Sequence, residues 1–380
     1  MTEATNRPAL GKTPAPDHAH DVVRYGVIGT GMMGCEHIAN ITALDGAAVT
    51  AICDPHEPSL AKARHALATA DNGTGPPTEF TDDRALIDSG LCDAVVIATP
   101  NHRHVTPLLD AMAAGLHVLV EKPLCTTLDD CRVVAEASRS HDAVAWVGLE
   151  YRYMPPVARL VQEVRSGTVG ELKMVSIREH RFPFFSKVDD WNRFNANTGG
   201  TLVEKCCHYF DLMNLLVKQR PRSVYASGGQ DVNHLDEYYD GRRSDILDNA
   251  FVIVDYANGV RGLVDLCMFA DATKNQEEIV AVGDAGKVES MLPDSTIRIG
   301  RRGEHWVGDV HEETIVDPRI KYTGGHHGSS YLEHLGFLEA IQSGGKPEVS
   351  LEDGMWAVAV GVAAHKSIEQ GCAVEVTLDA

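Results

Sequence analysis

The chain contains 380 residues and carries a formal net charge of −20, with 44% hydrophobic and 23% charged residues. The length suggests two domains, and the composition is that of a soluble globular protein. Because nucleic acid and anionic membrane surfaces repel an acidic surface, we expect neither as a partner. No apolar run approaches the length that a bilayer-spanning helix requires.

Residues 1–21 contain three prolines and no apolar stretch of the kind that a signal peptide needs, so we expect a flexible leader there. The nine cysteines are scattered, form no C-x-x-C pair and often lie inside apolar runs. This pattern predicts buried, reduced thiols in a cytoplasmic protein. Cys206 and Cys207 are adjacent, which is a poor spacing for chelating one ion, and we expect no metal site.

The first predicted element is a buried strand over Val22–Ile28, and a glycine-rich turn follows it directly. The residues of this turn, which we expect to bind a dinucleotide, are Gly29, Thr30, Gly31, Met32, Met33 and Gly34. The first glycine permits a tight turn, the second lets the backbone approach a pyrophosphate, and the third lets the next helix pack on the strand. The pyrophosphate then lies at a helix N-terminus, where free N–H groups favour negative charge.

Asp54 closes the next apolar run, Val49–Cys53. An acid at this place accepts hydrogen bonds from the adenosine ribose and repels a 2′-phosphate. The residues after it are Pro55 and His56, so no arginine stands ready for such a phosphate. We therefore expect NAD as the cofactor and consider NADP the less favoured one.

From residue 22 to about 150, apolar strands alternate with helical stretches, which predicts a doubly wound parallel sheet of the Rossmann kind. The strands are expected at Val22–Ile28, Val49–Cys53, Ala94–Ala98, His117–Val120 and Val144–Val147. Helices are expected between them, for example over Val105–Ala114 and Leu128–Ser140.

The pattern changes after Arg152, so residues 151–380 are expected to form a second α/β domain. A helix over about 154–166 precedes runs that predict a large open, mainly antiparallel sheet. These strands are expected at Leu172–Glu179, Arg222–Gly228, Ala250–Tyr256, Val260–Phe269, Glu277–Val282 and Lys287–Met291. Further helices are expected at Thr201–Val217, Ser330–Ser343 and Leu351–Gln370, and the last is a candidate to pack on the first domain.

Polar residues follow the strand that ends at Ala98, and ligands of open α/β sheets bind outside the carboxyl ends of strands. We therefore expect Thr99, Pro100, Asn101 and His104 to contact the cofactor on its nicotinamide side. Turn formation and helix capping explain Asn101 and His104 equally well, and one residue can do both.

Glu121-Lys122-Pro123 follows the strand His117–Val120 and leaves the sheet at the same edge as the glycine turn. Lys122 is therefore expected to point into the cofactor crevice, with Glu121 as a further cofactor contact. The proline restricts the backbone of the lysine and permits a cis bond. A fixed ammonium beside a substrate hydroxyl favours the alkoxide that develops as hydride departs, so Lys122 is a candidate for both catalysis and substrate binding.

Three segments together resemble the glucose–fructose oxidoreductase / inositol dehydrogenase / rhizopine-catabolism protein family (Gfo/Idh/MocA). They are Gly29-x-Gly31-x-x-Gly34-x-x-His37, Thr99-Pro100-Asn101-x-x-His104 and Glu121-Lys122-Pro123, of which the last is the most specific. The resemblance extends from about residue 22 to 370. It implies a Rossmann domain, a C-terminal α/β domain whose open sheet often mediates oligomers, and NAD(P)-dependent oxidation or reduction of a sugar or cyclitol hydroxyl.

The family's second motif is a glycine pair leading into a helix with an acid and, four residues later, a histidine. This chain has Gly199-Gly200 followed by Glu204 and His208, and residues four apart share a helix face. His208 is the candidate general base because its reference pKa lies near working pH, and Glu204 orients it or binds a substrate hydroxyl. The family commonly has Asp at position 204 and a small or apolar residue at 205. Lys205 therefore either contacts substrate, pairs with Glu204, or is only solvated.

Residues 178–197 mix aromatic and polar side chains, which suits a sugar-lining loop, because apolar rings stack on a sugar face while polar groups bind its hydroxyls. His180, Trp191 and Arg193 are substrate-binding candidates there, with Arg152 from the junction of the two halves. A loop that covers the core or contacts another subunit explains the composition equally well.

A glycine-rich segment over 324–328 contains two adjacent histidines, whose spacing is poor for zinc. We expect this segment to face the substrate or cofactor, with His326 as the substrate contact.

The sequence thus predicts an NAD-dependent dehydrogenase that oxidises a secondary hydroxyl of a sugar, sugar derivative or inositol, with Lys122 and His208 handling the proton. A non-catalytic cofactor-binding sugar sensor on the same fold is the alternative, which the presence of both residues disfavours. The Tyr-x-x-x-Lys pair of short-chain dehydrogenases does not occur in this chain. Since the open sheet of the second domain needs covering, we expect a homodimer or homotetramer.

Overall fold

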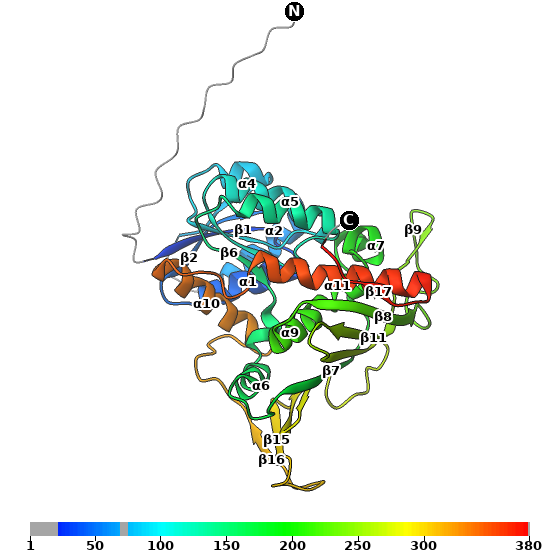
Figure 1. Cartoon of the computed structure of the whole chain (residues 1–380). Coiled ribbons are helices and arrows are strands. Elements are labelled where there is room, and N and C mark those ends of the chain that lie inside the picture. The colour runs from blue at the N-terminus through cyan, green and yellow to red at the C-terminus, as the bar shows by residue number, and fades with distance from the viewer. Residues whose placement is uncertain (1–21, 69–74, 379–380) are drawn as a thin grey trace, which may run out of the picture.

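The computed structural model describes residues 22–68 and 75–378 and contains two sheets (Figure 1). The predicted leader over residues 1–21 lies outside the described residues. Across the described part of the chain, no helix is both long and apolar enough to cross a membrane.

The first sheet is parallel throughout and has six strands in the order β3-β2-β1-β4-β5-β6. The strands are β1 (Val23–Ile28), β2 (Ala47–Cys53), β3 (Thr78–Phe80), β4 (Ala94–Ile97), β5 (His117–Glu121) and β6 (Ala145–Gly148). The helices are α1 (Met32–Thr42), α2 (Glu57–Ala68), α3 (Asp83–Ile87), α4 (Val105–Ala113) and α5 (Leu128–Ser138). The predicted doubly wound parallel sheet is confirmed.

The strand order reverses direction between β1 and β4, and this switch point fixes where a ligand can lie. At such a point the connections leave to opposite faces of the sheet, so a crevice opens at the carboxyl ends of the strands. The glycine turn follows β1, Thr99 follows β4, Lys122 follows β5 and Glu150 follows β6.

The second sheet has nine strands in the order β16-β15-β14-β13-β7-β12-β11-β8-β17, and only the β7–β12 pair is parallel. They are β7 (Leu172–His180), β8 (Pro221–Gly229), β11 (Asn249–Tyr256), β12 (Arg261–Cys267), β13 (Glu277–Gly283), β14 (Gly286–Leu292), β15 (Thr296–Arg301), β16 (His311–Thr314) and β17 (Val374–Glu375). The large, mainly antiparallel sheet is confirmed. Four strands of the two sheets, β3, β15, β16 and β17, were not predicted from the sequence. Of these, β3 and β16 have few or no buried side chains.

Helices cover one face of the nine-stranded sheet and leave the other face open. On β11, Val252 and Val254 are fully buried, while Phe251 is 61% and Ile253 is 43% exposed. Helices α6 (Pro155–Arg165), α9 (Cys207–Val217) and α11 (Leu351–Gln370) pack on the buried face.

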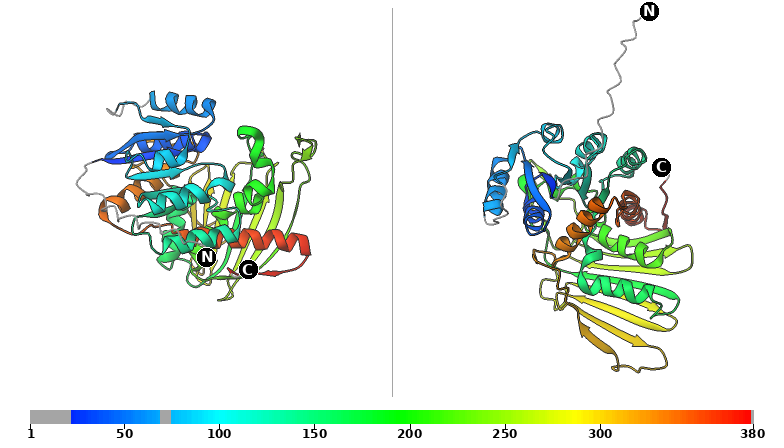
Figure 2. Two further views of the ribbon diagram at one scale, coloured as in Figure 1. Left: turned by 90° about the horizontal axis from the view of Figure 1, so that it is seen from above. Right: turned by 90° about the vertical axis from the view of Figure 1, so that its left-hand side faces the viewer.

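Helix α11 lies between the two domains, as Figures 1 and 2 show, whereas α10 (Ser329–Ser343) packs against α1. Helix α11 packs against α5 and β6 on one side and against α9 and β8 on the other. Gly361 permits the closest approach, because a Cβ there would lie 2.7 Å from the carbonyl oxygen of Leu202. The helix predicted over Leu351–Gln370 therefore packs on both domains.

The helix predicted over Thr201–Val217 is instead two helices, α8 (Thr201–Glu204) and α9, with Lys205 and Cys206 between them. The side chain of Lys205 enters a buried ion pair with Glu179 of β7. The remaining short elements are η1 (Asn101–Arg103), η2 (Glu150–Tyr153), η3 (Val188–Arg193), α7 (Asn195–Thr198), β9 (Tyr238–Tyr239) and β10 (Arg242–Arg243).

Candidate functional site

The glycine turn after β1 has the geometry that a bound pyrophosphate requires. Gly29 has φ +88°, and a Cβ there would lie 2.6 Å from Ala98. A Cβ on Gly34 would lie 2.0 Å from the carbonyl oxygen of Gly29, so the helix packs directly on the turn. A Cβ on Gly31 would meet no atom within 4 Å, which leaves open space at the N-terminus of α1. A phosphate group fits this arrangement of open space and free N–H groups.

Asp54 lies beside this turn and is held by backbone groups. Its Oδ2 accepts a hydrogen bond of 2.8 Å from the Thr30 N–H, and its Oδ1 accepts one of 2.8 Å from the His56 N–H. The carboxylate is thus fixed at the carboxyl end of β2. Its negative charge lies where the sequence predicts the adenosine ribose.

Thr99 and Asn101 carry buried polar atoms that remain without a hydrogen-bond partner among the described residues. These atoms are the Thr99 Oγ1 and the Asn101 Nδ2. Buried donors and acceptors are nearly always satisfied in native structures, so two such atoms at the carboxyl end of β4 fit a cofactor that would bind them.

His104 is placed differently from the prediction of a cofactor contact. It is fully buried, with Nδ1 2.9 Å from the Pro123 carbonyl oxygen and Nε2 3.1 Å from the Thr99 carbonyl oxygen. Both ring nitrogens therefore face backbone carbonyl oxygens, one of which accepts the N–H of the ring, and the ring packs between the loops after β4 and β5. Its side chain makes no capping hydrogen bond to α4 either.

Glu121 is also occupied by protein groups, although it follows β5 as expected. Its Oε1 lies 2.8 Å from His37 Nε2, and its Oε2 accepts a hydrogen bond of 3.1 Å from the Lys122 N–H. Burial alone raises the pKa of a carboxyl group, but the His37 contact and the Lys122 charge lower that of Glu121. An ionised Glu121 thereby positions the backbone of Lys122.

Lys122, Glu204 and His208 come together in an enclosed cluster, which we call the central cluster. The Lys122 Nζ donates a hydrogen bond of 3.3 Å to the backbone carbonyl of Glu204, and the Lys122–Pro123 bond is cis. Burial disfavours the charged ammonium, yet Cys207, Glu204 and Glu121 raise the pKa of Lys122. Lys122 is therefore a persistent cation.

His208 lies flat against Tyr151, with ring centroids 4.1 Å apart and an interplanar angle of 12°. Its Nε2 is 3.7 Å from Glu150 Oε1, and its Nδ1 has no hydrogen-bond partner among the described residues. Burial lowers the pKa of His208 well below its usual value, and the Lys122 and Lys205 charges lower it further. The imidazole is therefore neutral and able to accept a proton.

The carboxyl group of Glu204 faces several cations. Burial raises the pKa of Glu204, and the charges of Lys122, Lys187 and Arg193 oppose that rise. Lys187 was missed in the sequence because it sits in an irregular segment with no periodic pattern. Burial lowers the pKa of Lys187, and Glu204 partly restores it.

Lys205 lies beside the central cluster, and two buried groups engage its ammonium. Its Nζ lies 2.9 Å from Glu179 Oε1 and donates a hydrogen bond of 2.6 Å to the Tyr151 hydroxyl. The side chain is only 6% exposed, so it is neither solvated nor paired with Glu204.

Arg152 and His180 are not brought into the central cluster either. The Arg152 Nε donates a hydrogen bond of 2.6 Å to buried Asp211, and its Nη1 donates one of 2.9 Å to the Glu348 carbonyl. His180 follows Glu179 on β7, and successive side chains of a strand point to opposite faces. Glu179 is buried under the helices, so His180 projects from the other face, 3.2 Å from Asp265.

Trp191 and Arg193 belong to the segment that joins β7 to α8 and crosses to the first domain. The Trp191 ring makes an edge contact with His102, at a centroid distance of 6.2 Å. Arg193 is buried, and its Nε donates a hydrogen bond of 3.1 Å to Glu237. Its Nη1 has no hydrogen-bond partner among the residues described.

His326 lies at the margin of the central cluster, between two acids that the sequence patterns did not single out. Its Nδ1 is 3.0 Å from Glu36 of α1, and its Nε2 is 3.8 Å from Glu150. The signal for Glu150 was present, because this residue follows the carboxyl end of β6 just as Lys122 follows β5.

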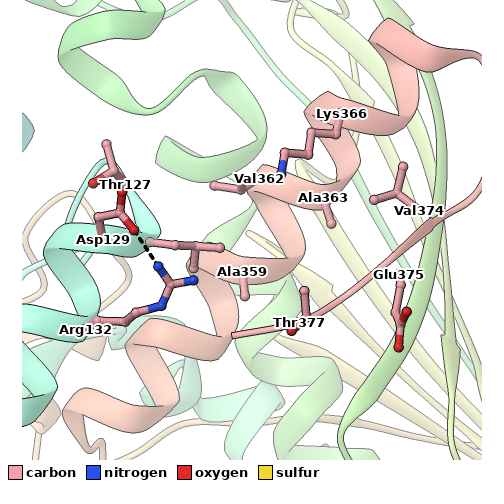
Figure 3. Close-up of a pocket in the computed structure, with 11 residues that line it drawn as sticks. Thr127, Asp129, Arg132, Ala359, Val362, Ala363, Lys366, Val374, Glu375 and Thr377 are labelled. Atoms are coloured by element: carbon pink, nitrogen blue, oxygen red, sulfur yellow. Dashed lines mark hydrogen bonds and ion pairs between the residues drawn. The ribbon is translucent and has the colours of Figure 1, made fainter. Parts of the chain in front are cut away.

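A separate cavity of about 260 Å³ lies between α5, α11 and β17 (Figure 3). Its polar lining includes Thr127, Arg132 and Lys366, and Arg132 is paired with Asp129. None of its lining residues belongs to the central cluster. Within residues 22–68 and 75–378, no group of three or more His, Cys, Asp and Glu side chains is arranged to hold a metal ion.

Two family models match this chain. The oxidoreductase family, NAD-binding Rossmann fold, matches residues 23–149, and the oxidoreductase family, C-terminal alpha/beta domain, matches residues 161–376. The chain belongs to the Gfo/Idh/MocA oxidoreductase family. The family resemblance and the NAD-binding Rossmann domain predicted from the sequence are confirmed.

Individual relatives differ in the chemistry that their names state. The myo-inositol 2-dehydrogenase of Thermotoga maritima is 28% identical over 361 residues, covering 92% of this chain and 97% of that protein. The 2,7-anhydro-N-acetylneuraminate hydratase of Escherichia coli is 24% identical, covering 94% of this chain and 98% of that protein. The solved structure of levoglucosan dehydrogenase with NADH and levoglucosan has a TM-score of 0.80 and 21% identity, covering 93% of this chain and 99% of that one.

Proposed function

We propose that this Gfo/Idh/MocA protein is an NAD-dependent dehydrogenase that oxidises a secondary hydroxyl of a sugar, sugar derivative or inositol. The observation that carries the proposal is the central cluster of Lys122, Glu204 and His208 beside the carboxyl ends of β4 to β6. The relatives named as inositol and levoglucosan dehydrogenases support this class of substrate.

The proposed cofactor site uses the glycine turn for the pyrophosphate, Asp54 for the adenosine ribose, and Thr99 and Asn101 for the nicotinamide side. Asp54 favours NAD over NADP, because a 2′-phosphate beside a fixed carboxylate is repelled. When bound, NAD supplies the acceptor for the hydride.

In the proposed mechanism, Lys122 and His208 both act on the substrate hydroxyl, and each has a different role. His208 is neutral and takes the hydroxyl proton as a general base. The Lys122 ammonium stabilises the negative charge that develops on the same oxygen. Glu204 and Lys187 are available for neighbouring hydroxyls, and Trp191 offers an apolar face to the sugar ring.

A non-catalytic sugar sensor on the same fold is the competing function, and the intact Lys122 and His208 pair disfavours it. All nine cysteines are free, which is compatible with the cytoplasmic location that we propose. One relative is named as a hydratase. The assay therefore has to measure the net reduction of NAD to NADH, because the formation of a new sugar product alone does not show that the substrate was oxidised.

The test is the appearance of NADH absorbance with a panel of myo-inositol, scyllo-inositol, levoglucosan and glucose, with NAD and NADP compared. We expect at least one member of the panel to be oxidised, and the Lys122→Met variant to bind NADH normally but to oxidise none measurably. An intact chain that binds NADH and oxidises nothing in a widened sugar and polyol panel would support the sensor instead.

A further inference from the structure

Oxidation of a hydroxyl releases one proton for each hydride transferred, and this proton has to leave the site before the next turnover. The residue that receives it is enclosed here, because the His208 side chain is only 2% exposed. Burial and the surrounding cations also make imidazolium at this position unfavourable. His208 therefore needs a neighbour that accepts the proton from it.

Glu150 is placed to be that neighbour. Its Oε1 lies 3.7 Å from His208 Nε2 and 3.8 Å from His326 Nε2, so one carboxylate oxygen stands between two imidazoles. Its Oε2 has no hydrogen-bond partner among the described residues, so this oxygen is free to accept a proton. Transfer requires a movement of the carboxyl group that shortens one of the two separations to hydrogen-bond length at a time.

His326 and Glu36 continue the path to the surface. His326 Nδ1 lies 3.0 Å from Glu36 Oε1, and the two side chains are 27% and 12% exposed. Glu36 Oε1 is also within 3.3 Å of the Gly325 N–H and of the Ser330 hydroxyl. These contacts hold the Glu36 carboxylate against the segment that carries His326. Both side chains are partly exposed, so water reaches this end of the path.

We propose that Glu150, His326 and Glu36 form the path by which the hydroxyl proton leaves the enclosed site, a role that rests on the proposed dehydrogenase function. The substrate C–H bond gives its hydride to NAD, and the O–H proton goes to one nitrogen of His208. The proton leaves the other nitrogen for the Glu150 carboxylate and passes from there to His326. It then exits to water directly or by way of Glu36. A histidine that gains a proton on one nitrogen and loses one from the other is left as the opposite tautomer, and a flip of the imidazole ring restores the starting tautomer before the next turnover.

The charges around the path favour this direction of transfer. Burial raises the pKa of Glu150, whereas that of His208 is lowered. Burial also opposes protonation of His326, but the Glu36 contact and the Glu150 charge raise its pKa overall. The other titratable groups that act on His326 are Lys205, Glu121, His208 and His327.

The test compares Glu150→Gln, His326→Asn and the matched control His327→Asn with the wild type, on the panel member that the wild type oxidises. His327 is the neighbouring histidine, and its φ of 57° is a conformation that asparagine tolerates. NADH formation and proton release, the latter followed with phenol red, are recorded in weakly buffered H₂O and D₂O. NADH affinity is measured by fluorescence.

We expect Glu150→Gln and His326→Asn to lower kcat about tenfold or more, with NADH affinity unchanged. Proton release should lag behind NADH formation in the first turnover, the solvent isotope effect should rise, and added imidazole should restore His326→Asn. His327→Asn should behave like the wild type.

Three results would overturn the path while leaving the dehydrogenase function intact. The first is a His326→Asn variant that matches His327→Asn. The second is a raised KM with unchanged kcat, which indicates a substrate contact. The third is lost turnover with no imidazole rescue and an unchanged solvent isotope effect, which indicates a structural role. If the wild type oxidises no sugar or polyol, the proposed function is wrong, and the proposed path is wrong with it.

Discussion

Lys122 and His208 share one enclosed cluster but are held in opposite charge states. Acids around Lys122 raise its pKa, while burial and nearby cations lower that of His208. One residue is thus a fixed cation and the other a free base at neutral pH.

The rate of oxidation should therefore fall on the acid side at a pH well below 6.5, since His208 must lose its proton to act as a base. His208→Gln should remove this acid limb and lower turnover by about two orders of magnitude or more, the scale of positioned acid–base catalysis. The measurement is kcat/KM from pH 4.5 to 9. An acid limb that survives in His208→Gln would assign the proton-accepting role to another group.

We expect Lys205 to be a buried cation with a structural role. It neutralises Glu179, which is fully buried, and donates to Tyr151, the ring on which His208 lies. Without the ammonium, the buried Glu179 carboxylate keeps Arg181 Nη1 at 3.4 Å and the Tyr209 hydroxyl as partners. We therefore expect Lys205→Met to lower the free energy of unfolding in urea titrations by less than the about 3–5 kcal/mol that a fully unpaired buried charge costs.

The matched control is the double variant Lys205→Met/Glu179→Gln. Since it removes both charges, it should recover part of the lost stability. A Lys205→Met variant as stable as the wild type but without turnover would instead make Lys205 a member of the catalytic machinery.

Asp54 permits a prediction about the cofactor. Its carboxylate is fixed by the Thr30 and His56 N–H groups, so it cannot turn away from a 2′-phosphate. We expect NADH to bind more tightly than NADPH in fluorescence titrations, and Asp54→Ala to reduce the ratio of the two affinities about tenfold or more, the size of one lost charge repulsion. A wild type that prefers NADPH would contradict this role.

At the scale of elements, the residues predicted best are those that follow parallel strands. The glycine turn was found from the spacing of its glycines after a strand. Lys122, Thr99 and Asn101 were found because the carboxyl ends of such strands meet at one edge, and this rule depends only on strand order. The same rule indicates Glu150, which follows β6. The chain positions of Glu204 and His208 came from the family motif.

Predictions from composition alone were less reliable, because composition does not determine the direction of a side chain. His180 follows Glu179 by one residue, and this single step along β7 moves it to the opposite face of the sheet. Arg152 and His104 are polar residues near the site, but Asp211 and two backbone carbonyls engage them. Such long-range partners depend on the packing of elements far apart in sequence.

The Glu36–His326 contact joins the segment that precedes α10 to α1. Because this contact involves a histidine, we expect the free energy of unfolding to depend on pH. The pKa of His326 is raised, because Glu36 and Glu150 outweigh burial. A raised histidine pKa adds stability that is fully present below about pH 6.5 and is lost as the pH rises through the folded-state value. The difference in Tm between the wild type and His326→Asn should therefore be larger at pH 6 than at pH 8.5. An equal difference at both pH values would show that the charge of His326 contributes little.

At the scale of the whole molecule, several contacts bring the two domains together around the central cluster. Helix α11 packs on both, Trp191 touches His102, and His326 touches Glu36. The candidate catalytic residues come from both sides, Lys122 from the Rossmann domain and His208 from the second. A folded interface between the domains is thus a condition for the proposed chemistry.

The open face of the nine-stranded sheet exposes large apolar side chains that the described part of a single chain does not cover. Tyr225, Ile253 and Leu263 stand side by side on β8, β11 and β12 and are 46%, 43% and 38% exposed, with Phe251 61% exposed nearby. A contiguous apolar patch of this kind marks an interaction surface, whereas single exposed apolar residues are ordinary.

We therefore expect the protein to be a homodimer or homotetramer that buries this face. A lysine at its centre would have to be desolvated in the interface, so Ile253→Lys should shift the assembly toward monomers. Light scattering at micromolar concentration measures the mass, and circular dichroism checks that the variant stays folded. The control is Val133→Lys, which changes an apolar residue of similar exposure, 52%, on α5 and away from the sheet. The control should keep the mass of the wild type. A monomeric wild type, or an Ile253→Lys variant with undiminished mass, would show that this face is not where copies of the chain meet.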